Sequence, residues 1–88
     1  MTIKRLNVST EDGLQPKAAA LLVQVASKYT SSILLEQGSK RVNAKSIMGV
    51  LSLKLRRGDT LLLAVSGDDE DEAAESIAQL IEKGEAKQ

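Results

Sequence analysis

The chain of 88 residues contains no cysteine, no histidine, no tryptophan and no phenylalanine. Without cysteine it can form neither a disulfide framework nor a thiolate nucleophile, which fits a reducing compartment. Without histidine it lacks the side chain that most often serves as a general acid or base near neutral pH. Tyr29 is the single aromatic residue, so the core must be built from aliphatic side chains.

Long apolar runs are also missing, since none approaches the ~20 residues needed to span a bilayer. The first residues interleave polar and apolar side chains and contain no apolar stretch of the kind found in signal peptides. We therefore expect a cytoplasmic protein with no membrane association. Hydrophobic residues make up 42% of the chain, which is enough for a core, and we expect residues 1–88 to form one small domain.

The charges balance to zero but are segregated along the chain. Residues 40–57 hold six basic side chains and no acidic one, whereas residues 59–75 hold seven acidic side chains and no basic one. The acidic block is typical of a solvated helix start. The basic block could attract phosphate, nucleic acid or an acidic protein surface.

Alternation, helical spacing and turn residues predict the order strand, helix, strand, strand, helix, strand, helix. The predicted elements cover residues 2–9, 16–29, 33–35, 41–42, 46–57, 60–66 and 69–83. In the first helix, Ala18, Leu21, Leu22, Val25, Ala26 and Tyr29 share one stripe. In the last helix, Asp69 and Glu72 have the spacing of a capping box, and Ala73, Ile77, Leu80 and Ile81 form the stripe expected to be buried. This order predicts an α+β open-faced sandwich, a four-stranded antiparallel sheet covered on one face by three helices.

Ser46 is the expected N-cap of the second helix, because a serine hydroxyl can accept a hydrogen bond from a free amide of the first turn. The apolar residues that follow, Ile47, Met48, Val50, Leu51 and Leu55, spread over an arc of roughly 160° on a helical wheel. So short a helix cannot bury this whole arc against one sheet. We therefore expect Ile47 and Met48 to be exposed beside Ser46 as a docking surface.

The same segment carries a family resemblance. The run Val42-Asn43-Ala44-Lys45-Ser46-Ile47-Met48-Gly49-Val50-Leu51-Ser52-Leu53 resembles the regulatory serine segment of the HPr family, the phosphocarriers of the sugar phosphotransferase system. Gly13-Leu14-Gln15-Pro16-Lys17-Ala18-Ala19 takes the place of the family's active-site loop, with Gln15 where the phosphoryl-accepting histidine stands. That combination is similar to the Crh branch of the family. Pro16, Lys17 and Ala18 depart from the usual Ala-Arg-Pro order. The resemblance implies the HPr-like sandwich fold.

The resemblance also implies a function in carbon catabolite repression. Ser46 would be phosphorylated by HPr kinase/phosphorylase, and the phosphorylated protein would act as corepressor of the LacI-type catabolite control protein (CcpA). The residues implied in partner binding are Gln15, Lys17, Lys45, Ile47, Met48 and Leu51. Glutamine offers no nucleophilic nitrogen at position 15, so we expect no phosphocarrier activity.

Two other functions stay open as alternatives: a phosphotransferase-system carrier, which would need a titratable acceptor at position 15, and a small nucleic-acid binder using the basic block. The second is disfavoured because the chain has no aromatic platform and no net positive charge. Ser46 has no base partner in the sequence, and the chain has neither calcium-loop spacing nor a phosphate-binding glycine motif, so we expect no enzymatic activity, no metal site and no cofactor. The expected outward-facing residues Leu34, Leu62 and Ala64, and a Gly13-containing loop after the first strand, make a homodimer or a domain swap a further hypothesis.

Overall fold

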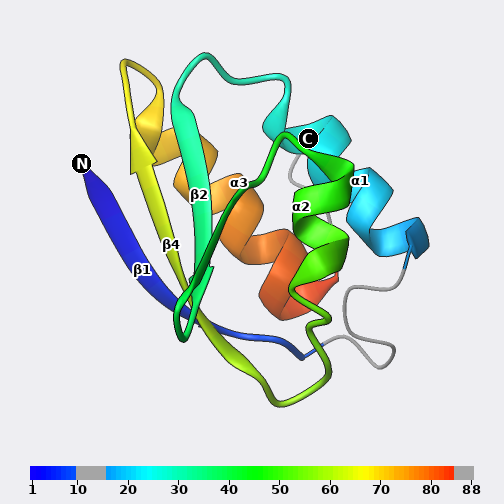
Figure 1. Cartoon of the computed structure of the whole chain (residues 1–88). Coiled ribbons are helices and arrows are strands. Elements are labelled where there is room, and N and C mark those ends of the chain that lie inside the picture. Colours follow the sequence, from blue (N-terminus) through cyan, green and yellow to red (C-terminus); the bar gives the residue numbers. More distant parts are fainter. Residues whose placement is uncertain (10–15, 85–88) are drawn as a thin grey trace.

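The computed structural model describes residues 1–9 and 16–84. Within them the elements follow one another in the predicted order (Figure 1). They are β1 (Thr2–Asn7), α1 (Pro16–Ala26), β2 (Ser32–Gln37), β3 (Lys40–Asn43), α2 (Ile47–Ser52), β4 (Thr60–Ser66) and α3 (Glu70–Lys83).

The four strands form one antiparallel sheet with the spatial order β1-β4-β2-β3. A tight hairpin through Gly38 joins β2 to β3, whereas β4 returns between β1 and β2. In the described residues, all three helices lie on the same side of the sheet, and no described helix lies over the opposite face (Figure 1). The predicted open-faced α+β sandwich is therefore confirmed.

The core lies between the sheet and the helices and consists of aliphatic side chains, as the near absence of aromatic residues requires. Alternate strand residues point into it, because successive side chains of a strand face opposite sides. The strands supply Leu6, Ile33, Leu35, Leu61, Leu63 and Val65, all at most 2% exposed. The predicted stripe of α3 is confirmed, with Ala73, Ile77, Leu80 and Ile81 buried.

The start of α3 differs from the predicted capping box. Asp69 is the N-cap residue, but its side chain makes no hydrogen bond within the helix. Its carboxylate instead accepts hydrogen bonds from the backbone N–H groups of Thr30 and Ser31 and from the Ser31 hydroxyl. These donors come from the segment that leads into β2. Gly67 packs closely against Ser31 at the same place. A Cβ added to Gly67, whose φ is +152°, would lie 2.7 Å from the Ser31 Cα, so the close packing requires glycine.

Two helices end earlier than predicted. The first helix stops at Ala26, and Tyr29 lies beyond it, where its hydroxyl shares a 2.6 Å hydrogen bond with Ser76 Oγ on α3. The second helix stops at Ser52 instead of near Arg57, and Lys54 then adopts a positive φ of 51°. This early turn places Leu53 and Leu55 in the core, at 4% and 2% exposure. Leu55 is thus buried by the loop and does not belong to the helix face.

Candidate functional site

Ser46 lies exposed at the start of α2 and is its N-cap, as predicted. Its backbone is extended (φ −111°, ψ 116°), and its hydroxyl oxygen accepts a 3.2 Å hydrogen bond from the Gly49 N–H. The Ser46 N–H in turn donates to the Asn43 carbonyl at 3.0 Å. The backbone of Ser46 is therefore held between β3 and α2, while its hydroxyl stays accessible to solvent.

Gly49 lies where α2 approaches the sheet closely. An added Cβ at Gly49 would lie 3.3 Å from Val42 Cβ and 3.5 Å from the Asn43 carbonyl oxygen. A side chain at residue 49 would therefore be tight against Val42, and glycine eases the close approach of the helix to β3. At the other end of the helix, the Lys40 ammonium donates to the Ser52 carbonyl at 3.1 Å. These contacts fix the short helix at both ends and so fix the place of Ser46.

An apolar ridge, which we define as Ile47, Met48 and Leu51, follows Ser46 on α2. Met48 is 74% exposed and Ile47 is 37% exposed, while Leu51 is half-buried. Leu21 on the neighbouring helix α1 is 38% exposed as well. The helical spacing assigned Leu21 to the buried stripe, but α1 turns it outward and buries Ala19 instead. The helices α1 and α2 lie side by side, so Leu21 is a candidate member of this surface that the sequence did not reveal (Figure 1).

The lysine next to the serine does not point toward it. The Lys45 ammonium donates a 2.8 Å hydrogen bond to the carbonyl oxygen of Tyr29, beyond the end of α1, and the Lys45 side chain is half-buried. The Lys45 backbone N–H donates to the Asn43 side chain at 2.8 Å. Lys45 therefore ties the residues before α2 to the segment after α1.

The remaining predicted contacts are Lys17 and Gln15. Lys17 is exposed in its first turn. Gln15 lies outside the residues that the structure describes. The structure therefore brings Ser46, Ile47, Met48 and Leu51 together on α2, places Lys17 on the adjacent helix, and holds the Lys45 charge against the backbone.

Acidic side chains at the start of α3 contact the N-terminal end of the chain. The Thr2 hydroxyl lies 2.8 Å from a carboxylate oxygen of both Glu70 and Asp71, which share its single proton, and the N-terminal ammonium lies 3.0 Å from Glu70. In the described part of the chain, no group of three or more acidic side chains is placed to hold a metal ion. Among those same residues, no helix has both the length and the apolar character needed to cross a membrane.

The fold and this surface place the chain among small open-faced sandwiches with an exposed serine at the start of a short helix. The family model described as "PTS HPr component phosphorylation site" matches residues 3–83. The chain therefore belongs to the PTS HPr family.

Individual relatives agree with this assignment. The HPr-like protein Crh of Halalkalibacterium halodurans is 47% identical over 83 residues, covering 94% of this chain and 99% of that protein. The crystal structure of the phosphocarrier protein HPr from Bacillus anthracis matches with a TM-score of 0.90 and 41% identity, covering 92% of this chain and 96% of that chain.

A third similar structure is that of Crh from Bacillus subtilis, which matches with a TM-score of 0.77 and 42% identity over the full length of both chains. That protein is described as a catabolite repression protein and as an intertwined, domain-swapped dimer. Similar proteins thus include both a phosphocarrier and an HPr-like protein that dimerises.

Proposed function

We propose that this protein is a non-enzymatic regulator of carbon catabolite repression that is switched by phosphorylation of Ser46. HPr kinase/phosphorylase would add the phosphate, and the phosphorylated protein would act as corepressor of the LacI-type catabolite control protein. The observation that carries the proposal is the exposed Ser46 hydroxyl at the start of α2, next to the exposed Ile47 and Met48. The similarity to proteins named Crh supports the pathway.

Phosphorylation would change the charge of this surface without disturbing the fold. A phosphate adds about −1.5 to −2 charges, and the first turn of a helix tolerates negative charge because its N–H groups are free. The Lys45 ammonium already donates one of its three N–H groups to the Tyr29 carbonyl, so it would neutralise the phosphate only in part. The dianion would therefore remain available for arginine or lysine side chains of the partner.

The apolar ridge supplies the second half of the recognition. A phosphate alone could be imitated by any acidic patch, because charge complementarity steers association more than it selects a partner. A flexible methionine that is 74% exposed can fill a partner pocket of matching shape. We propose that Met48 and Ile47 enter such a pocket while Leu51 packs at its edge.

The lysines and Gln15 have secondary parts in this proposal. Lys17 contributes positive charge beside the ridge, although an ammonium lacks the bidentate geometry of arginine. Lys45 acts by positioning the start of α2. Gln15 makes a polar contact at most, because an amide offers no nucleophilic nitrogen and the chain has no histidine imidazole to accept a phosphoryl group. We therefore propose that the protein does not carry phosphate between phosphotransferase components.

The proposed partners imply a cytoplasmic location, and they are compatible with a homodimer. A kinase and a DNA-bound repressor meet this protein in the cytoplasm, and the repressor, not this chain, would contact the DNA. The dimer described for Bacillus subtilis Crh supports a homodimer here. In this chain β1 is an edge strand and also the first element of the chain, so it is an element available for exchange. Gly13, the expected hinge, lies outside the described residues.

Two parallel labelling reactions test the proposed switch. Purified HPr kinase/phosphorylase with ATP should add one phosphate, which mass spectrometry locates on Ser46 and which Ser46→Ala abolishes. Phosphoenolpyruvate with the general phosphotransferase enzyme should leave the protein unlabelled, with an authentic HPr as positive control. Acid-labile label from phosphoenolpyruvate would refute the regulator assignment and favour the carrier alternative.

A further inference from the structure

The open face of the sheet carries exposed apolar side chains that the proposed function does not use. Ile3 on β1 is 61% exposed and Leu62 on β4 is 36% exposed. Leu34 on β2 and Ala64 on β4 belong to the same face and are half-buried. This face is opposite the helices, so it is separate from the surface around Ser46 (Figure 1).

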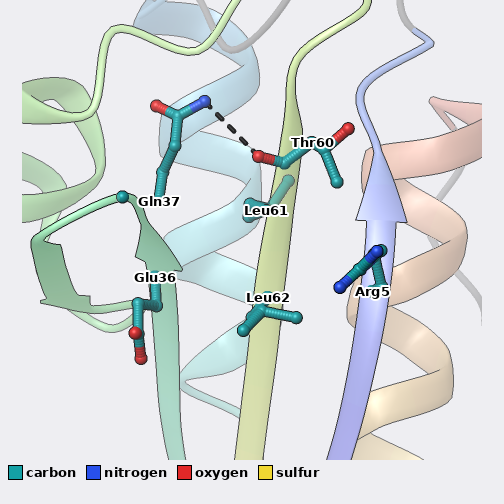
Figure 2. Close-up of a pocket in the computed structure, with 7 residues that line it drawn as sticks. Arg5, Glu36, Gln37, Thr60, Leu61 and Leu62 are labelled. Atoms are coloured by element: carbon teal, nitrogen blue, oxygen red, sulfur yellow. Dashed lines mark hydrogen bonds between the residues drawn. The ribbon is translucent and has the colours of Figure 1, made fainter.

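The strand register arranges these outward-facing residues in two rows across the sheet. In the first row, Ile3 pairs with Ala64, which pairs with Leu34. In the second row, Arg5 pairs with Leu62, which pairs with Glu36, and Arg41 follows on β3. Figure 2 shows the centre of this second row, with Leu62 on β4 between Glu36 on β2 and Arg5 on β1. The two opposite charges thus flank the same apolar residue, one on each side of β4.

This pattern is self-complementary. A two-fold axis that runs along β4, between two such faces, would exchange the β1 side of one copy with the β2 side of the other. Leu62 would then meet Leu62 of the second copy, Ala64 would meet Ala64, and Ile3 would meet Leu34. Arg5 of each copy would lie opposite Glu36 of the other. An axis placed over any other strand, or perpendicular to the strands, does not bring both charge pairs into register.

We propose that a second copy of this chain docks on the open sheet face, with Arg5 of each copy paired to Glu36 of the other around a Leu62 contact. The spacings allow it, because facing sheets pack ~10 Å apart and adjacent strands lie ~4.8 Å apart, within reach of an arginine side chain. Within one copy, Arg41 Nη2 already lies 3.4 Å from Glu36 Oε2. In the dimer, the Glu36 carboxylate would therefore be shared by two guanidinium groups.

The proposed contact is small. Four short strands present a face whose burial falls at or below the ~1,200 Å² of a minimal stable interface. The dimer should therefore be weak and in rapid exchange. It needs neither the phosphate on Ser46 nor the exchange of β1 between copies, and it leaves the Ser46 surface open to a partner.

A charge-exchange experiment with the full chain tests the geometry. Arg5→Glu alone and Glu36→Arg alone should each weaken self-association by about tenfold or more, because each homodimer would hold two like-charge contacts. A 1:1 mixture of the two variants should associate about as tightly as the wild type, because both of its contacts pair opposite charges. Sedimentation equilibrium up to ~1 mM protein measures the affinity, and NMR titration of labelled Arg5→Glu with unlabelled Glu36→Arg should shift amides of β1, β4 and β2.

Two controls make the result specific. Lys4→Glu changes the same charge on the same strand but on the other side of the sheet, so it should leave association unchanged. Arg41→Ala removes the existing partner of Glu36 and should have a smaller effect than either charge reversal. The proposal fails if the wild type stays monomeric at ~1 mM, or if the mixture does not associate. It fails equally if both single variants dimerise as the wild type does, which is the behaviour of a strand-swapped dimer.

Discussion

Asp69 and Glu70 connect the start of α3 to distant parts of the chain. The Ser31 hydroxyl, followed by the Thr30 amide, holds the pKa of the Asp69 carboxyl below its ordinary value of 3.8. The Thr2 hydroxyl, followed by the N-terminal ammonium, holds the pKa of Glu70 below its ordinary value of 4.5. Each carboxylate therefore binds a proton less readily in the folded protein than in the unfolded chain.

This difference predicts how stability depends on pH. A carboxyl with a lowered folded-state pKa stabilises the fold fully above its unfolded pKa, and that contribution is lost as pH falls through the folded value. The free energy of unfolding should therefore decline below about pH 4.5. Asp69→Asn should lower stability at pH 7, and its difference from the wild type should shrink in acid. Urea unfolding at a series of pH values measures this. A difference that stays constant from pH 7 to pH 2.5 would contradict the assigned role of Asp69.

At the level of elements, α2 is short and depends on its contacts at both ends. Ser46 satisfies one free amide through the 3.2 Å bond from Gly49, so Ser46→Ala should cost about 1 kcal/mol of stability. Ser52→Ala is the matched control, because the Ser52 hydroxyl donates 2.6 Å to the Gly49 carbonyl in the last turn and does not cap the helix. Such back-bonding contributes little, so that variant should lose less than about 0.5 kcal/mol. Equal losses in denaturant unfolding would show that Ser46 does not act as a cap.

The elements themselves were predictable because local signals and tertiary structure agree. Alternation in β4 and helical spacing in α3 match the buried residues, and the turn at Gly38 lies between the strands predicted at 33–35 and 41–42. The capping box and the length of α2 were mispredicted for a common reason. Asp69 accepts hydrogen bonds from the segment that leads into β2 in place of a bond within its own helix. The early end of α2 accompanies the burial of Leu55 in the core. Contacts far apart in sequence decide both cases.

The candidate surface was predictable to a similar extent. The serine N-cap and the exposure of Ile47 and Met48 follow from the short helix, and both are confirmed as structural features. The direction of Lys45 and the exposure of Leu21 were not visible in the sequence. Both depend on how α1 packs beside α2. The functional roles of these residues remain predictions.

At the scale of the whole molecule, we propose a different binding function for each face of the sheet. In our proposals the helix side would present Ser46 and the apolar ridge to a partner protein, while the sheet side would contact a second copy. The chain has no net charge, so a phosphate on Ser46 would change the overall charge as well as the local surface. Since charge mainly accelerates encounter and apolar contact mainly slows release, the switch requires both.

Titration of this protein onto the purified LacI-type catabolite control protein tests the central claim most directly. Binding should be measured by calorimetry for the unphosphorylated protein, the form phosphorylated on Ser46, and phosphorylated Met48→Ala. The phosphate and Met48 should each contribute on the order of 1–3 kcal/mol, so losing either should weaken binding roughly ten- to a hundredfold. Leu62→Ala, on the opposite face, should bind like the wild type. Equal affinity with and without the phosphate would contradict the account.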